Sequence, residues 1–367
     1  MPQRRKIVCH AVGGSCVPPG HEDITRTQIA KQIAALLASD AGGDYDPGSG
    51  EKAPDLYFVP SETLTKEHAE RDLGIASELD LFGGVVPHAY IATKIITHPL
   101  PSSHAVAPDN WSTEFGSRVA GVVLPGYSAF AIQDALDAAA VLLERGPVRI
   151  KRVRETGGRG QFVASTMPEV KARLGEIDER EIGRYGVVLE LNLDQVKTLS
   201  VGQIRVGHWI ASYYGIQRLT PDHHGDMVYG GSQLFVVRGD MDALLARDLP
   251  HEVRTALEQA RVYDAAANAC FDGFYASRRN YDIAQGVDTR GQPYSGVLEQ
   301  SWRIGGASTA EICALQAFAK EPRLEAIRAT CTEICGPCRI PDGATLYYAG
   351  DDPRVGYITK YAIVERL

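Results

Sequence analysis

One segment, Pro147–Gln161, narrows what this 367-residue chain can fold into. It starts with a β-branched run that ends in Lys151, and a loop rich in glycine follows at Gly157, Gly158, Arg159 and Gly160. The run predicts a strand, and the glycines predict a tight reversal after it. Neither the Gly-x4-Gly-Lys-Ser/Thr pattern nor the Gly-x-Gly-x-x-Gly pattern occurs, so the familiar nucleotide-binding folds are not indicated.

Two interpretations of this loop stay open. A lysine at a strand end can pair with phosphate oxygens, and glycines let backbone N–H groups approach them. The same residues also suit a plain hairpin whose basic side chains are solvated. The segment by itself favours neither.

Composition excludes several classes of protein. Hydrophobic content of 44% and charged content of 23% suit a globular chain with a sizeable core. The net charge of −8 argues against non-specific binding to nucleic acid or to an anionic membrane. No apolar stretch approaches the roughly 18 residues of a membrane helix, and the apolar run after the basic N-terminus is too short for a signal peptide. The seven scattered cysteines indicate reduced thiols, so we expect a cytoplasmic protein.

The first unit, residues 1–115, reads as an open α/β domain. A strand at 6–12, a helix at 25–39 and a strand at 56–59 follow one another, which predicts a parallel sheet. The segment 40–54 is rich in Gly, Asp and Pro, and it is expected to be a loop.

The rest of the chain reads as two further units, 116–190 and 191–367, in an α/β arrangement that becomes α+β in its second half. The smaller unit has an amphipathic helix at 131–144 and a buried strand at 187–191. The larger one is rich in β-formers over 197–237, which predicts antiparallel hairpins, and its clearest helix is expected at 252–277. No internal repeat occurs, and a homodimer remains open.

A second group of polar residues follows in this β-rich region. Asp282 and Glu299 are predicted on adjacent strands, where both can face one side and hold a hard cation such as Mg²⁺. Arg303 comes four residues after Glu299. The alternative is a solvated acidic face with Arg303 in a surface pair.

Together, these groups resemble the ATP-grasp superfamily, which includes biotin carboxylases, D-alanine ligases and glutathione synthetases. In that pattern a strand lysine precedes a Gly-rich loop, a hinge strand ends in Glu, and an acidic residue precedes Glu-x-Asn-x-Arg. The matching places are Lys151, Gly157-Gly158-Arg159-Gly160, Glu190-Leu-Asn-Leu193, Asp282 and Glu299-Gln-Ser301-Trp-Arg303. The resemblance covers roughly residues 116–318 and is nearest to an uncharacterised bacterial family of that superfamily.

The resemblance implies a two-subdomain ATP-grasp fold and an ATP-dependent ligase that joins a carboxylate to an amine through an acyl phosphate, with ATP and Mg²⁺ as cofactors. Lys151 and Arg303 would be the catalytic residues, with Arg303 stabilising the transferred phosphoryl group. The ATP contacts would come from Lys151, Gly157, Gly158, Arg159, Gly160, Glu190 and Leu193, and the metal ligands from Asp282, Glu299 and Ser301.

Ser301 departs from the pattern, because a serine stands where the pattern has an asparagine. A hydroxyl is a shorter and weaker Mg²⁺ ligand than an amide carbonyl. A nucleotide-binding protein without ligase activity, acting as a sensor or partner, is therefore the alternative function.

Three further features are open. Lys94 is either an earlier ATP-contacting lysine or a solvated surface residue. Arg205 and Arg218 are candidates to grip a substrate carboxylate, since Arg suits bidentate contacts. The spacing of Cys331, Cys335 and Cys338 is that of cluster-binding cysteines, so an Fe–S or zinc protein is a second alternative, against a cysteine-rich helix end and loop.

Overall fold

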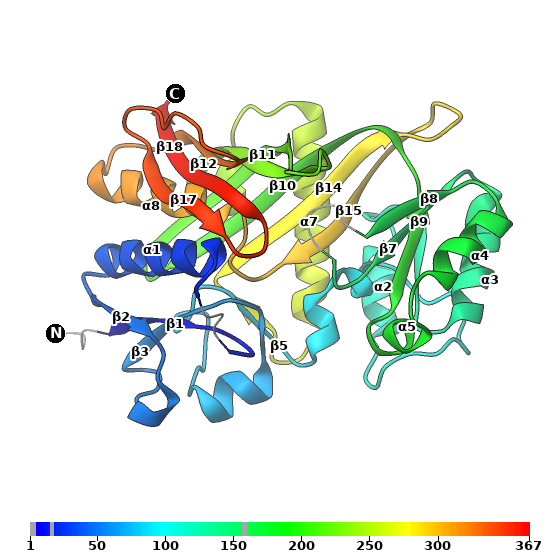
Figure 1. Ribbon diagram of the computed structural model, residues 1–367, viewed down its shortest axis with the longest axis horizontal. Helices are drawn as coiled ribbons and strands as arrows, with labels where there is room; N and C mark the ends of the chain where they lie inside the picture. The colour runs from blue at the N-terminus through cyan, green and yellow to red at the C-terminus, as the bar shows by residue number, and fades with distance from the viewer. Residues whose placement is uncertain (1–4, 15–17, 156–159) are drawn as a thin grey trace.

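The computed structural model describes residues 5–14, 18–155 and 160–367 of the chain. Within these residues the strands form four sheets, of three, three, four and eight strands. The eight-stranded sheet runs across the molecule, with the N-terminal sheet at the lower left and the four-stranded sheet at the right of the view (Figure 1). Among the helices of this described part, none combines the length and the apolar character that a membrane crossing needs.

The N-terminal sheet is parallel and has the order β2 (Asp40–Asp44), β1 (Lys6–His10), β3 (Leu56–Pro60). Helix α1 (His21–Leu36) connects β1 to β2. The expected open α/β start is confirmed, but the segment 40–54 is not only a loop. A Cβ at Gly42 would lie 2.7 Å from Cγ of Lys6, so the glycine lets this segment approach β1 closely enough to pair with it.

A small sheet links distant parts of the chain. Strands β4 (Leu64–Thr65) and β5 (Gly84–Val86) are joined there by β13 (Tyr275–Ala276). The helix expected at 252–277 is therefore too long: α7 (His251–Cys270) stops before a turn at Gly273, whose φ of +77° suits glycine. The short helix η2 (His68–Asp72) lies between β4 and β5, and η3 (Ala89–Ala92), η4 (Lys94–Thr97) and α2 (Thr113–Val119) follow β5 along the chain.

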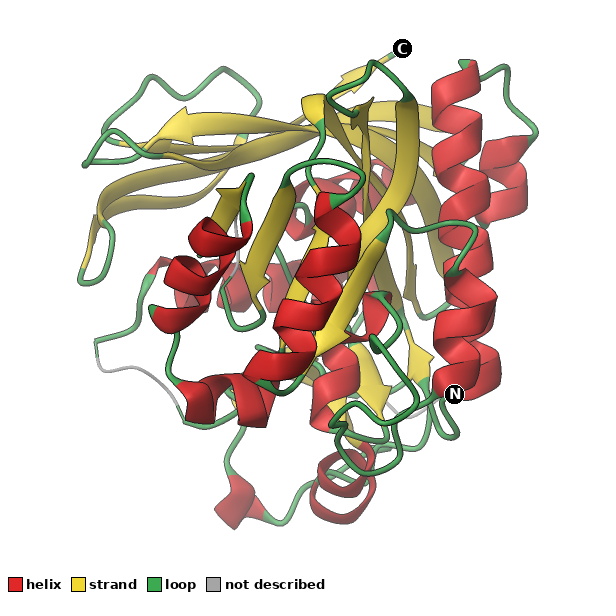
Figure 2. Ribbon diagram, turned by 90° about the vertical axis from the view of Figure 1, so that its right-hand side faces the viewer, coloured by secondary structure: helices red, strands yellow, loops and turns green. Residues whose placement is uncertain are grey.

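The four-stranded sheet is antiparallel, in the order β6 (Gly126–Ala129), β9 (Val187–Leu191), β7 (Val148–Arg152), β8 (Gln161–Ala164). Helices α3 (Ile132–Leu143), α4 (Met167–Gly175) and α5 (Glu179–Tyr185) cover one face of it, which is turned toward the viewer in Figure 2. Apolar residues of these helices and strands form a core of their own.

The eight-stranded sheet is antiparallel and begins with the expected hairpins. Its order is β15 (Pro293–Ser301), β14 (Arg278–Val287), β10 (Asp194–Val206), β11 (Trp209–Pro221), β12 (Met227–Arg238), β16 (Ala326–Cys335), β18 (Gly356–Arg366), β17 (Thr345–Asp352). Helix α6 (Met241–Leu245) follows β12. Helices α1 and α8 (Ser308–Lys320) share one core with this sheet, and α2 and α7 share another.

Candidate active site

A buried ion pair lies where the strand lysine and the hinge glutamate meet. Lys151 on β7 is 4% exposed and Glu190 on β9 is 2% exposed, and the Lys151 ammonium contacts Oε1 of Glu190. The second carboxylate oxygen lies 3.3 Å from Nε2 of His98. Burial by itself raises the pKa of the Glu190 carboxyl, but the charge of Lys151 and the contact with His98 outweigh it and hold that pKa at about 2. Two residues that the sequence places 39 positions apart are thus joined in one charged cluster.

Lys94 belongs to the same region, and the interpretation as a solvated surface residue is wrong. Its side chain is 7% exposed, and its ammonium lies 3.0 Å from Oε2 of Glu299. It also donates to the backbone carbonyl of Glu155, at 3.0 Å, just before the glycine loop. One lysine therefore connects η4, the β7–β8 connection and β15.

Asp282 and Glu299 face each other across β14 and β15, as the sequence predicts. The hydroxyl of Ser200 donates to Oδ1 of Asp282 at 2.9 Å, and the side-chain amide of Asn280 lies 3.1 Å from the same atom. Burial and then the charge of Glu299 raise the pKa of the Asp282 carboxyl. Two carboxylates that repel each other in this way suit a hard cation, so the donor set fits Mg²⁺. Within the described ranges, however, no group of three or more His, Cys, Asp or Glu side chains is placed to hold a metal.

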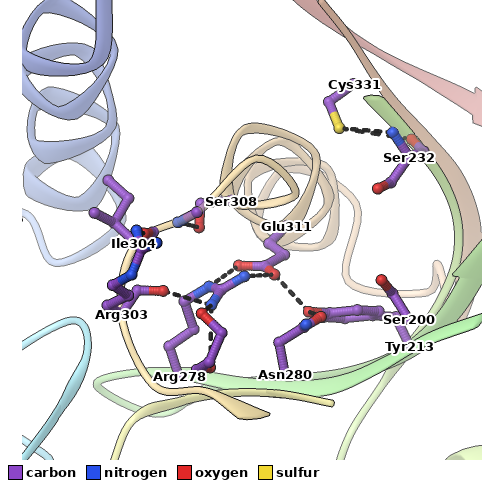
Figure 3. A network of polar contacts seen from close by, with 12 residues as sticks. Ser200, Tyr213, Ser232, Arg278, Asn280, Arg303, Ile304, Ser308, Glu311 and Cys331 are labelled. Atoms are coloured by element: carbon purple, nitrogen blue, oxygen red, sulfur yellow. Dashed lines mark hydrogen bonds and ion pairs between the residues drawn. The ribbon is translucent and has the colours of Figure 1, made fainter. Parts of the chain in front are cut away.

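The end of β15 is fixed by a buried arginine that sequence reasoning missed. Arg278 forms a two-point ion pair with Glu311 of α8, at 2.8 Å on both sides. Its NH1 donates to the carbonyl of Arg303 (Figure 3). The same NH1 donates to the carbonyl of Ser301 and lies 3.4 Å from the Ser301 hydroxyl. The side chain of Arg303 itself is 33% exposed and pairs with Glu62, 3.2 Å away. Arg303 is thus held at the border with the N-terminal sheet.

The glycine loop is described only in part. Gly157, Gly158 and Arg159 lie outside the described residues. Gly160 has a φ of +62°, and its carbonyl accepts from the backbone of Arg152. Because β7 and β8 pair as neighbours, this segment closes a hairpin, which both interpretations of the loop require. Leu193, expected near an adenine ring, is buried against Leu191 and Ala284.

The two substrate candidates do not share one site. Arg205 lies opposite Ile210 in the β10–β11 pair, whereas Arg218 is eight residues further along β11, which is about 26 Å at the rise of a strand. Arg205 is 3.5 Å from Glu78, and Arg218 is exposed. A single carboxylate cannot contact both.

The cysteine triplet does not converge either. Cys331 and Cys335 lie on strand β16 rather than at a helix end, four residues or about 13 Å apart. The buried Cys331 thiol accepts from the backbone N–H of Ser232 at 3.2 Å (Figure 3). Thiols this far apart cannot ligate one zinc ion or one cluster, so the Fe–S or zinc interpretation is wrong.

His98, Arg278 and Glu311 are the residues of this region that the sequence did not reveal. His98 follows η4 as a single histidine with no neighbouring pattern, and a Cβ at Gly126 would lie 2.7 Å from its ring. Glu311 reads as one more polar residue of a helix. The only usable signal was the pair Arg278-Arg279 immediately before the strand that carries Asp282.

Two solved structures share this fold over nearly the whole chain. The first is the biotin carboxylase domain of the 2-oxoglutarate carboxylase of Hydrogenobacter thermophilus, in complex with MgADP, ADP and bicarbonate. It is 14% identical, with a TM-score of 0.53, and the match covers 100% of this chain and 87% of that one. The second is the phosphoribosylamine–glycine ligase of Thermotoga maritima, 14% identical with a TM-score of 0.52, covering 99% of this chain and 92% of that one. Both are ATP-grasp ligases, and the chain therefore has the ATP-grasp fold.

A comparison with curated proteins found no match. The model of the family described as protein of unknown function (DUF3182) matches residues 10–362, and the chain belongs to this family.

Proposed function

We propose that the protein is an ATP-dependent ligase that joins a carboxylate to an amine through an acyl phosphate. The observation that supports the proposal is a pair of charged groups, Lys151 with Glu190, and Lys94 with Glu299 and its register partner Asp282. The bond from Lys94 to the carbonyl of Glu155, four residues after Lys151, connects the two groups. These residues come from two sheets and a short helix between them, and the order along the chain is the ATP-grasp order. The two ATP-grasp structures of the same fold support the reaction class.

The roles follow from charge and position. Lys151, backed by Glu190, would bind the α- and β-phosphates, and Lys94 would reach the phosphates from η4. Gly157, Gly158, Arg159 and Gly160 would close over them, Glu190 would take the ribose or adenine edge, and Leu193 would lie against the adenine plane. Mg²⁺ held by Asp282, Glu299 and the 301 position would shield the phosphate charges. Phosphoryl transfer of this kind needs positioning and charge neutralisation more than covalent work by the protein.

The proposed reaction has two steps, phosphoryl transfer and then attack by the amine. A carboxylate oxygen of the substrate attacks the γ-phosphorus, the bond to the β-phosphate oxygen breaks, and ADP leaves. The amine then attacks the acyl carbon, phosphate leaves, and the amine nitrogen loses a proton. Arg303, partly exposed at the border with the N-terminal sheet, would stabilise the charge of the transferred group.

ADP release with Mg-ATP and a matrix of acids and amines tests the proposal. We expect release that needs both an acid and an amine, and that equals the amide formed. Lys151→Met should lower kcat by about 10²–10³, since it removes the charge that would bind the phosphates. Lys171→Met, on the exposed face of α4, is the matched control and should leave the rate unchanged. Tight ATP binding without turnover of any pair would overturn the ligase proposal.

One observation favours a second candidate, a nucleotide-binding protein without ligase activity. The Ser301 hydroxyl is a poor substitute for an amide and already lies 3.4 Å from Arg278. Under this candidate, metal-dependent activity would appear only in Ser301→Asn, whereas a ligase is active without that change.

A further inference from the structure

The face of the sheet that carries Ser301 also carries an amide, one strand away. Asn280 on β14 is the register partner of Ser301, as Asp282 is of Glu299. Residues two apart on a strand point to the same face, so these four side chains lie together. Asn280 is 7% exposed. The structure therefore places an asparagine beside the carboxylates, although the sequence pattern lacks one at 301.

The hydrogen bonds around Tyr213 indicate how this amide is oriented. The Tyr213 oxygen lies 2.6 Å from Oε1 of Glu311 and 2.9 Å from Oδ1 of Asn280 (Figure 3). A tyrosine hydroxyl has one proton and can donate only once. Glu311, fully buried and ion-paired with Arg278, is the charged and closer acceptor, so it takes that proton. The Tyr213 oxygen can then only accept a hydrogen bond from Asn280. The Asn280 side chain must therefore turn its NH₂ group toward Tyr213.

This orientation directs the amide carbonyl toward Asp282. The oxygen and nitrogen of an asparagine amide have nearly the same size, so the two orientations differ in hydrogen bonding rather than in packing. The structure assigns the nearer amide atom as Nδ2, 3.1 Å from Oδ1 of Asp282, which already accepts from Ser200. In the reversed orientation the amide oxygen takes the place of that nitrogen. Two oxygens at that separation repel each other, and a cation that both bind removes the repulsion. With the cation bound, one orientation of the amide both donates to Tyr213 and avoids repulsion with Asp282.

We propose that the side-chain carbonyl of Asn280 is the amide ligand of the metal, in place of the asparagine that Ser301 replaces. This inference rests on the proposed function, because it assigns a ligand within the same site. The chain keeps the donor chemistry of the ATP-grasp metal site and supplies the amide from the neighbouring strand. Ser301 then helps to fix the end of β15 through its contacts with Arg278.

Tyr213 is a positioning residue in this arrangement. It lies on β11, and it reaches Asn280 on β14 across the intervening strand β10. Gly202 of β10 is the register partner of both, and a Cβ there would lie 2.3 Å from the Tyr213 ring. The absence of a side chain at 202 is what allows the tyrosine to meet the amide.

The test counts Mn²⁺ bound per chain by electron paramagnetic resonance with saturating ADP. We expect Asn280→Ala to weaken Mn²⁺ binding by at least about tenfold, and Asn280→Ala/Ser301→Asn to restore most of it. Asn268→Ala, on the exposed side of α7, is the matched control. Restoration by an amide at 301 distinguishes a ligand from a residue that only stabilises the fold.

If Asn280→Ala does not fold, Tyr213→Phe is a second variant that tests the same proposal. It retains the ring, frees the amide orientation, and should weaken Mn²⁺ binding several-fold with ADP still bound. Unchanged Mn²⁺ binding in Asn280→Ala, or no rescue by Ser301→Asn in a folded double variant, overturns the role of Asn280 while ADP binding and release leave the ligase proposal standing. A wild-type chain that binds neither ADP nor Mn²⁺ overturns both.

Discussion

Glu190 is a carboxylate almost without solvent contact, and its surroundings decide its charge. Removal from water favours the neutral acid, whereas Lys151 and His98 favour the ionised form. The outcome is a pKa of about 2, well below the ordinary 4.5. A buried ion pair adds little to the free energy of unfolding when compared with an apolar pair of similar size. Removing one partner lowers that free energy strongly, because the other charge stays buried without a partner.

Glu190→Gln should therefore lower the free energy of unfolding at pH 7 by about 3–5 kcal/mol. Since the folded pKa is depressed, the stability that Glu190 contributes is fully present above about pH 4.5 and is lost as pH falls toward 2. The difference between the two proteins in urea denaturation should shrink over that window. Glu176→Gln, in an exposed pair with Arg173, should change stability by less than about 0.5 kcal/mol. Denaturation curves of wild type and Glu190→Gln that stay equally far apart from pH 7 to pH 3 would contradict this explanation.

Single residues were predictable where a local pattern marked them. Lys151 ends a β-branched run, and Glu190 lies near the end of another, so both could be found from the sequence. His98 and Glu311 could not, because one histidine after a short turn and one glutamate in a helix look like any polar residue. Their significance comes from partners 92 and 33 positions away, Glu190 and Arg278, which only the folded chain brings near.

The close packing of β10 against its neighbouring strands requires a position without a side chain, Gly202. Alanine there would put a Cβ 2.3 Å from the Tyr213 ring and 2.6 Å from the backbone oxygen of Arg279. Gly202→Ala should destabilise the protein by about 1–3 kcal/mol in chemical denaturation, as overpacked cores do. Gly121→Ala is the control, since no atom lies within 4 Å of its Cβ position. Equal stability of the two variants would show that β10 and β11 can separate without cost.

Helix α1 is capped from the far end of the chain. Its N-cap is Gly20, which has no side chain to accept the free N–H groups, and Oδ2 of Asp352 accepts from the backbone of His21 at 2.7 Å. Asp352→Ala should cost about 0.5–2 kcal/mol of stability, the usual range for a lost cap. Asp351→Ala, one residue earlier and exposed, should cost much less. Equal losses in thermal unfolding would mean that the β17 turn, and not the cap, is what the variants disturb.

Element prediction succeeded and failed for identifiable reasons. The strands at 56–59 and 187–191 are largely apolar runs, and both form as expected. The edge strand β2 has the sequence Asp-Ala-Gly-Gly-Asp, which reads as a loop, and it forms because β1 supplies a partner that glycine can approach. The segment after Cys270, expected to continue the helix, instead turns at Gly273 and forms β13, because β5 supplies a partner strand. Tertiary pairing overrode local preference in both cases.

At the scale of the whole molecule, the proposed site lies where segments from three sheets meet. Lys94 contacts Glu155 of the β7–β8 connection and Glu299 of the eight-stranded sheet, and Arg303 contacts Glu62 of the N-terminal region. No local pattern predicts that positions 94 and 299 touch, because the chain closes a loop of 205 residues between them. The order of the motifs was readable from the sequence, but this junction was not.

The cores differ on the two sides of that junction. The N-terminal sheet, α1, α8 and the eight-stranded sheet share one continuous core, whereas one face of the four-stranded sheet packs with its helices in a core of its own. On its other face, Val188 belongs to the core that contains α2 and α7. In hydrogen exchange without nucleotide, peptides from β1, α8 and β16 should lose protection together, and peptides from α3 and β9 should do so separately and sooner. Helices and strands that share buried apolar contacts open as one unit.

A ligand bound between the two cores should couple them. At about 100 times its dissociation constant, a ligand stabilises the state that binds it by about 2.7 kcal/mol. Mg-ADP should therefore slow exchange in α3 and β9 most, bringing them close to β16. Lys94→Met should reduce this effect, since it removes a side chain that contacts both halves, while Lys197→Met, near the exposed start of β10, should not. Exchange at one rate throughout the nucleotide-free protein would mean a single cooperative unit. Protection by Mg-ADP confined to the N-terminal sheet would move the nucleotide away from Lys151.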